Sequence, residues 1–516
     1  MERGRRRIRK TTTTTTKVIK VVNKNNNNDN NNNVLKKMKT IARKTKASSE
    51  LIYIAICSRI LLILSMFVFD LLISDYDTSV QFKKNDSNNM FCSSVESIAV
   101  WDAVHVFRIA QVNGYEYEHS RAFYPALPFT LRFISRLFVY AEDDDDDDGI
   151  SICAIGVVGL VLNALFFVAT VIIMEKLAFL ILINRQREGE ELDDDVDVLL
   201  TKKKSIARTC AILFCFNPAT IFYIAPGYTE TLFTFFATYG ALQFSRGTAI
   251  AQKQEKNDCV RLYFFYKATS YFLFSMAACF RSNGILLSLY PACEMISILL
   301  RNKNYLSTSS RYVLIMSLHI VGGLMITIPT IYTQIDAYKS FCGKDSRYEI
   351  NSSSMVGDDD DKEGRRPWCS EIPPNMYAFV QAKYWDVGFM KSWRIAQLPN
   401  IMIASPAIFA STYGLFKIFI QADGGFSSFR TTSVDYIAGN ILWMVSLVLC
   451  ATVTHIQISM RFLSTLSMPY ICIARIGAID GLERFSKKKR DAMVSTFFVS
   501  YALIGIVMFS NFYPWT

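Results

Sequence analysis

Long apolar blocks separated by shorter polar segments dominate the pattern along this chain, and the apolar residues inside them follow neither the helical nor the strand period. A helix of about 20 apolar residues crosses the hydrocarbon of a bilayer, where the backbone must satisfy its own hydrogen bonds. The pattern therefore predicts an all-α polytopic membrane protein with about 11 transmembrane helices. The predicted spans are residues 51–73, 150–184, 205–224, 228–246, 260–279, 282–300, 311–333, 395–420, 434–456, 457–478 and 492–513.

The first 50 residues differ from the rest of the chain. The net charge of the chain is +11, and residues 1–50 carry 15 Lys and Arg residues against three acidic residues, so the positive charge is local to this segment. Runs of Thr (Thr11–Thr16) and Asn (Asn25–Asn33, interrupted by Asp29) predict a disordered, low-complexity basic tail. Because the segment contains no aromatic residue, it is not expected to bind nucleic acid.

Positive charge also predicts the orientation of the chain in the membrane. Lys and Arg before block 51–73 hold the N-terminus in the cytosol, so this block is expected to be a signal-anchor helix that opens a transmembrane domain of residues 51–516. The same rule places three basic loops in the cytosol, residues 247–259, 301–310 and 481–491. Two long loops, 74–149 and 334–394, then share the lumenal side.

Two further features agree with this topology. The glycosylation sequons at Asn85 and Asn351 both fall in the predicted lumenal loops. The apolar segment 121–140 must return to the side from which it starts, so it is expected to be re-entrant or interfacial.

The cysteines fit an oxidising compartment on one side of the membrane. Cys342 and Cys369 share loop 334–394, where they either pair or remain free thiols. Most other cysteines lie in predicted spans, where they are expected to pack as small hydrophobic residues, namely Cys57, Cys153, Cys210, Cys215, Cys279, Cys450 and Cys472. No Cys or His spacing typical of a zinc site occurs, and the acidic run Asp143–Asp148 is either a metal ligand set or a solvated insertion.

Candidate chemistry is concentrated near Trp101 and Asp102. The chain lacks the phosphate-binding loop, the serine nucleophile elbow and the dinucleotide-binding glycine motif of soluble enzymes. If residues 100–111 are helical, Asp102 and His105 lie one turn apart on the same face, at a lumenal membrane boundary. A carboxylate placed there is suited to remove a proton from an attacking hydroxyl, as inverting glycosyl transfer requires. The alternative is that Asp102 is a helix cap or loop carboxylate, with His105 and His119 as ordinary surface histidines.

Several polar residues interrupt the apolar blocks or lie at their ends. They are Glu230, Arg281, His455, Gln457 and Arg461. The predicted topology brings most of them to the lumenal side, where Asp102 also lies. Ionisable groups at membrane depth usually face a cavity or a partner, but hydrogen bonding between packed helices is the alternative.

Ordered motifs give the chain a resemblance to a known family. They are Trp101, Asp102, His105, Ile109, Ala110, Gly114, Tyr115, Glu118 and Ala122–Pro125; Phe216–Ala219 with Tyr228–Glu230; Arg281–Gly284; Gln381–Gly388 with Trp393, Gln397–Asn400 and Pro406; and His455, Gln457, Arg461 and Phe462 with Phe512–Trp515. In this order the motifs resemble those of the PIG-V family of glycosylphosphatidylinositol (GPI) mannosyltransferases. The inserted polar runs fall between the motifs and do not interrupt them.

The resemblance implies a GT-C-type helical bundle in the endoplasmic reticulum membrane, with an active site on the lumenal first loop. It implies transfer of the second mannose of the GPI core, in α1,6 linkage, from dolichol-phosphate mannose to the GPI-precursor glycolipid. The donor's β-linked phosphate becomes an α-glycoside, so the transfer inverts the anomeric carbon. Because the leaving group is a lipid phosphate, neither a metal nor a cofactor is expected.

The resemblance also assigns residues. Asp102 is expected to be the catalytic base, with Trp101 as its essential neighbour. Arg281, Arg461 and His455 are expected to contact phosphate, and the remaining substrate-binding candidates are His105, Glu118, Glu230, Gln381, Trp385 and Gln457. Three matters stay open: a different lumenal acceptor, a non-catalytic subunit or transporter in place of an enzyme, and the need for a small membrane partner subunit.

Overall fold

The computed structural model describes residues 28–76, 90–138, 150–185, 196–252, 257–301, 310–342, 366–421, 433–479, 487–513 and 515. The chain divides into two compact units, Met1–Tyr53 and Ile54–Thr516. Some predicted features lie outside the described residues, namely both sequons, the run Asp143–Asp148 and residues 1–27 of the predicted tail. The first described helix begins at Asn28.

All regular structure in the described residues is helical, which confirms the predicted all-α class. The α-helices are α2 (Asn28–Leu72), α3 (Met90–Ser97), α4 (Asp102–Val112), α5 (Ala126–Phe138), α6 (Ile152–Asn184), α7 (Val196–Cys215), α8 (Glu230–Ala251), α9 (Asn257–Phe280), α10 (Leu289–Arg301), α11 (Ser310–Cys342), α12 (Met376–Trp385), α13 (Leu398–Gln421), α14 (Val434–Thr452), α15 (Ser459–Ser464), α16 (Ser467–Ile479) and α17 (Lys487–Ser510). Short 3-10 helices are η1 (His119–Ala122), η2 (Thr220–Tyr223), η3 (Ser282–Ser288), η4 (Pro367–Cys369), η5 (Ile395–Gln397) and η7 (Ile456–Ile458).

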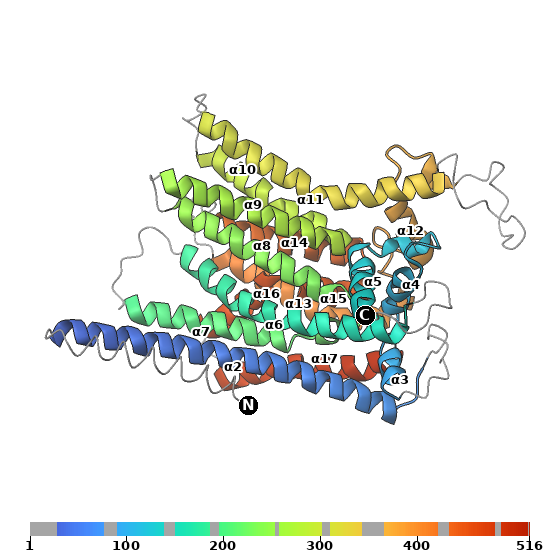
Figure 1. The fold of residues 1–516 in the computed structure, drawn as a ribbon, viewed down its shortest axis with the longest axis horizontal. Helices are drawn as coiled ribbons and strands as arrows, with labels where there is room; N and C mark the ends of the chain where they lie inside the picture. Colours follow the sequence, from blue (N-terminus) through green and yellow to red (C-terminus); the bar gives the residue numbers. More distant parts are fainter. Residues whose placement is uncertain are drawn as a thin grey trace, which may run out of the picture. The chain divides into compact units, whose positions relative to one another are not determined.

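Long helices form the body of the second unit. Helix α8 packs against α6 and α9, and α9 packs against α11, so these four run side by side (Figure 1). Six described helices are long and apolar enough to cross a membrane, at Ser49–Leu72, Ile152–Asn184, Ser282–Leu300, Tyr312–Cys342, Ile395–Ile418 and Val434–Thr452. The multispan class is therefore confirmed, and the count of about 11 spans stays a prediction.

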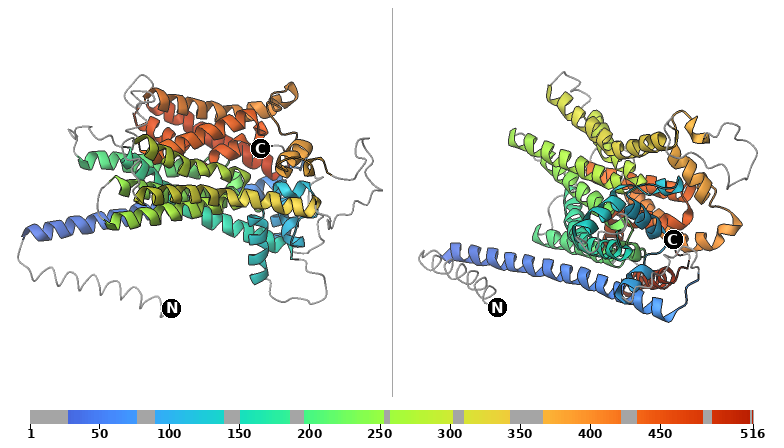
Figure 2. Two further views of the ribbon diagram at one scale, coloured as in Figure 1. Left: turned by 90° about the horizontal axis from the view of Figure 1, so that it is seen from above. Right: turned by 45° about the vertical axis from the view of Figure 1, so that its right-hand side comes forward.

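Helix α5 covers part of the segment that we expected to be re-entrant or interfacial. Its 13 residues extend about 20 Å, which is shorter than the hydrocarbon core of a bilayer. It runs across the direction of the long helices (Figures 1 and 2). One face exposes Phe129, Phe133 and Leu137, and Phe138 is exposed at the end of the helix. These features support an interfacial position, which remains a prediction.

Two disulfides fasten the end of this unit that carries α4 and α12. Cys342 at the end of α11 pairs with Cys369 in η4, which decides the alternative left open by the sequence. Cys153 pairs with Cys92 of α3. The expectation that Cys153 packs as a free thiol within a span was wrong, because α6 begins only one residue earlier, at Ile152, and Cys153 lies at the helix end beside α3.

Candidate active site

Four charged side chains from separate segments meet beside the start of α4. Arg461 Nη2 lies 2.8 Å from Asp102 Oδ2, and Arg461 Nε donates to Glu230 Oε1 at 2.6 Å. Arg281 Nη1 lies 2.6 Å from the same Glu230 oxygen. The structure thus gathers Asp102, Glu230, Arg281 and Arg461 into one ion-pair network, four of the residues singled out in the sequence.

Local backbone structure places the two carboxylates. Asp102 and Glu230 are the first residues of α4 and α8, where the positive end of the helix dipole favours a negative charge. Gly227, with a φ of 81°, lies directly against α4: a Cβ at this position would stand 2.7 Å from the Cα of Ala103. Only glycine allows this close approach, which brings the start of α8 next to Asp102.

Burial differs sharply within the network. The Glu230 side chain is fully buried, those of Arg281 and Arg461 are each 10% exposed, and that of Asp102 is 35% exposed. A buried charge is tolerated only when it is paired, so Glu230 holds the two guanidinium groups in place. Asp102 is consequently the most exposed member of the network.

Aromatic rings surround the buried guanidinium groups. The Arg461 guanidinium lies 4.8 Å from the ring centre of Phe222 and 5.0 Å from that of Tyr228, within the range of cation–π attraction. The Tyr228 hydroxyl donates to the Val100 carbonyl at 3.1 Å, which fastens the segment leading into α4. Sequence reasoning included Tyr228 in a motif but missed this supporting role.

Trp101 has an unusual backbone conformation directly before Asp102. Its φ is 52° and its ψ is −110°, a conformation that bulky residues rarely adopt. Trp101, and not Asp102, occupies the cap position of α4, so the alternative of Asp102 as a helix cap does not describe this structure. Backbone strain of this kind is typical of functional sites.

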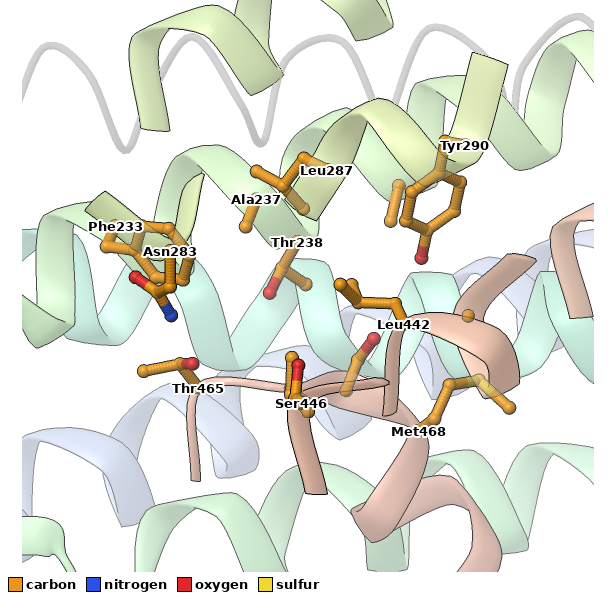
Figure 3. Close-up of a pocket in the computed structure, with 14 residues that line it drawn as sticks. Phe233, Ala237, Thr238, Asn283, Leu287, Tyr290, Leu442, Ser446, Thr465 and Met468 are labelled. Atoms are coloured by element: carbon orange, nitrogen blue, oxygen red, sulfur yellow. The ribbon is translucent and has the colours of Figure 1, made fainter. Parts of the chain in front are cut away.

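A small cavity of about 20 Å³, with room for about one water molecule, lies inside the helical bundle close to the network. Figure 3 shows its lining from α8, η3, α10, α14 and the segment before α16. Figure 3 shows Asn283 and Phe233 together at one end of the cavity. The Phe233 ring centre lies 5.9 Å from the Arg281 guanidinium, and the buried Asn283 Oδ1 has no hydrogen-bond partner among the described residues. Its walls are mostly apolar, with a few polar side chains such as Asn283 and Thr238.

Glu118 belongs to a different cluster. It accepts hydrogen bonds from Trp368 Nε1 at 2.8 Å and from the Tyr384 hydroxyl at 3.1 Å, and it pairs with Arg366 at 3.4 Å. In this structure Glu118 therefore ties the segment after α4 to η4 and α12.

The other predicted substrate-binding residues are spread over two places. Trp385, at the end of α12, packs near the hydrophobic cluster around Trp368, and its ring meets that of Phe123 at 6.3 Å. Gln381 also lies on α12, and its backbone carbonyl accepts a hydrogen bond from the backbone N–H of Val387. His455 and Gln457 are half-buried at η7, immediately before the helix that carries Arg461.

His105 lies one turn along α4 from Asp102. Its ring stacks on Phe123 with centres 5.1 Å apart and meets the edge of His119 at 5.4 Å. Burial lowers the pKa of His105, the Asp102 charge opposes this effect, and His119 adds to it. Burial also lowers the pKa of His119, against the opposing charge of Glu118. Both histidines therefore favour the neutral form.

A second buried ion pair was missed in the sequence. Lys267 Nζ on α9 lies 2.8 Å from Glu294 Oε2 on α10, with side chains 0% and 7% exposed. The Tyr263 hydroxyl donates to Glu294 Oε1 at 3.2 Å and lies 3.0 Å from His319 Nε2 on α11. The signal was present, because Lys267 and Glu294 both interrupt apolar blocks.

Comparisons with known proteins find relatives of this chain. GPI mannosyltransferase 2 of Drosophila melanogaster is 25% identical over 495 residues, which cover 90% of this chain and 98% of that protein. GPI alpha-1,6-mannosyltransferase 2 of Rattus norvegicus is 27% identical over 377 residues (70% and 66%), and that of Homo sapiens is 26% identical over 375 residues (69% and 66%). Among solved structures, the archaeal oligosaccharyltransferase AglB from Archaeoglobus fulgidus matches with a TM-score of 0.43 and 11% identity, covering 91% of this chain and 56% of that one.

The family model described as Mannosyltransferase (PIG-V) matches residues 48–516. This match begins just before the first apolar block and includes every member of the ion-pair network. The chain belongs to the mannosyltransferase (PIG-V) family.

Proposed function

We propose that this protein transfers mannose in α1,6 linkage from dolichol-phosphate mannose to the GPI-anchor precursor, as the second mannose of the GPI core. The names of its relatives support the linkage and the acceptor. The observation that carries the proposal is the accessible Asp102 carboxylate, which is paired with a buried arginine. A negative group and a positive group side by side suit a reaction that removes a proton at one point and releases a phosphate nearby.

In the proposed reaction Asp102 takes the proton of the acceptor hydroxyl as its oxygen attacks the anomeric carbon of mannose. A new carbon–oxygen bond forms, the bond from the anomeric carbon to the phosphate oxygen breaks, and the electron pair leaves with dolichol phosphate. Because Arg461 contacts Oδ2, we assign the proton transfer to Oδ1 of Asp102. The attack comes from the face opposite the phosphate and inverts the anomeric centre.

Arg281 and Arg461 are the groups proposed to stabilise the departing phosphate. A guanidinium group has five N–H donors in a rigid fork that matches phosphate oxygens. Within the network, Nη1 of Arg281 and Nε of Arg461 contact Glu230, and Nη2 of Arg461 contacts Asp102.

The disulfides support a lumenal site in the endoplasmic reticulum. Both occur at the end of the unit that carries α4, and disulfides persist in oxidising compartments. Together with the basic tail, this favours a cytosolic N-terminus.

Membership of a mannosyltransferase family leaves a different lumenal acceptor as the alternative to separate by experiment. Purified protein is supplied with labelled dolichol-phosphate mannose and either a GPI precursor bearing one mannose or an N-glycan precursor. The proposal predicts labelling of the GPI precursor, with mannose that an α1,6-specific mannosidase removes. Labelling of the N-glycan precursor alone would overturn it.

A further inference from the structure

Aromatic rings from three segments form a connected array beside the site. Tyr117 stacks on His119 with ring centres 5.4 Å apart, and His119 lies 5.5 Å from Tyr384 of α12. The array continues from His119 to His105 of α4 at 5.4 Å. We call these four rings, Tyr117, His119, Tyr384 and His105, the ring platform.

The ring platform is fixed in position but only partly covered. Tyr117 is 59% exposed and Tyr384 is 42% exposed, although both belong to an ordered set of contacts. The Tyr384 hydroxyl donates to buried Glu118, and the Tyr117 carbonyl accepts the Ser120 hydroxyl at 2.6 Å. Rigid, half-exposed aromatic rings lose little conformational entropy when a ligand covers them.

Exposed rings at a membrane boundary also occur in interfacial belts, where they face lipid headgroups. The surroundings of the ring platform favour a different occupant. Arg108 and Glu116 form a bidentate ion pair at its edge, with both bonds at 2.6 Å and side chains 55% and 34% exposed. Rings bordered by a polar, solvent-accessible edge fit a ligand with an apolar face and hydroxyl groups around it.

Helix α4 connects the ring platform to the catalytic carboxylate. Asp102 and His105 are three residues apart and therefore lie on the same side of the helix, and Arg108 lies one further turn along, about 120° around the axis from Asp102. At 1.5 Å per residue, Asp102 and Arg108 are about 9 Å apart along the axis. A chain of linked sugars along this face would present one hydroxyl to Asp102 while another ring covers the ring platform.

We propose that the ring platform binds the glycan of the acceptor, with the C–H face of a sugar ring against Tyr117 and Tyr384 and its hydroxyls towards Arg108 and Glu116. The aromatic faces are electron-rich and attract the weakly positive C–H groups of a pyranose. The ion pair supplies donors on one side chain and acceptors on the other. The inference rests on the proposed function and deepens it, because it separates the acceptor site on α4 from the donor site at Arg281 and Arg461.

The test compares KM for the two substrates in purified enzyme. Tyr117→Leu removes the ring, and the KM for a GPI precursor bearing one mannose is expected to rise about three- to tenfold, while the KM for dolichol-phosphate mannose stays the same. Tyr117→Phe retains the ring and is expected to recover most of the acceptor affinity. Tyr413→Leu, at a position on α13 that is 45% exposed, is the matched control and should change neither KM.

A second measurement uses the lipid-free glycan of the same precursor as a competitive inhibitor. It should inhibit the native enzyme more strongly than the Tyr117→Leu variant, by the same factor as the change in KM. If Tyr117→Leu leaves the KM for the acceptor unchanged, or raises only the KM for the donor, the ring platform does not bind the acceptor glycan. Either result would leave the proposed function intact. A native enzyme that transfers no mannose to the GPI precursor would overturn both.

Discussion

Arg461 holds Asp102 at 2.8 Å while the same guanidinium contacts buried Glu230 at 2.6 Å. The position of the proposed base therefore depends on a fully buried carboxylate. Arg281 shares that carboxylate, so the base and the proposed phosphate contacts are parts of one electrostatic unit.

Loss of the Glu230 charge should therefore affect folding as well as catalysis. Glu230→Gln leaves Arg281 without its counter-charge and Arg461 with Asp102 alone, which is expected to lower the free energy of unfolding by about 3–5 kcal/mol. Thermal unfolding of the purified protein measures the effect. Glu116→Gln, in an ion pair with 34% and 55% exposed side chains, is the control and should cost no more than about 1 kcal/mol. Equal losses in the two variants would contradict the burial argument.

The paired histidines predict a dependence on pH. Burial lowers the pKa of His105 and of His119 below the ordinary value, so the unfolded chain binds a proton before the folded protein does. Stability should be constant above about pH 6.5 and fall as the pH decreases from there through the lowered pKa values. Melting temperatures of the native protein and of His105→Gln between pH 7.5 and 5 test this. The variant should lose less stability on acidification, and parallel curves would show that His105 does not contribute.

The disulfide between Cys342 and Cys369 closes a segment with a sequence separation of 27 residues. Replacing both cysteines by serine is expected to lower the free energy of unfolding by about 2–4 kcal/mol, chiefly by releasing a constraint on the unfolded chain. Limited proteolysis near α12 reports the change. Cys279→Ser, at a half-buried free cysteine, serves as the control. Peptide mass mapping without reductant should recover the Cys342–Cys369 linkage, and two free thiols would refute the assignment.

The ion pair of Lys267 and Glu294 should behave as a structural unit remote from the chemistry. Lys267→Met leaves a buried carboxylate without its partner and is expected to destabilise the protein by about 3–5 kcal/mol. The double variant Lys267→Met/Glu294→Gln removes both charges and should recover a large part of that loss. A double-mutant cycle measured by thermal unfolding tests the coupling. Additive losses would mean that the two residues do not stabilise each other.

Features that depend on the local pattern of residues could be predicted from the sequence. Apolar blocks predicted the helices, and the costly charges in or beside them, Glu230, Arg281 and Arg461, indicated the residues that meet Asp102. The sequence did not predict which charge pairs with which, because each pair joins distant segments. Glu118 illustrates the limit: its partner Trp368 is 250 residues away, so nothing near Glu118 in the sequence shows that it joins the segment after α4 to η4. The prediction for Cys153 was wrong for a different reason. A shift of a few residues in the start of a helix decides whether a cysteine lies inside a span or at its end.

The most direct test of the account is the turnover of Asp102→Asn. Asparagine retains the size of the side chain and a polar contact to Arg461 but cannot take up the proton. With saturating dolichol-phosphate mannose and GPI precursor, the account predicts a fall in kcat of about 10²- to 10⁴-fold, with the melting temperature close to that of the native protein. Asp197→Asn, another aspartate in the first turn of a helix but exposed on α7, should retain native turnover. A kcat for Asp102→Asn within about twofold of the native value, far less than loss of a general base produces, would contradict the assignment of Asp102 as the base.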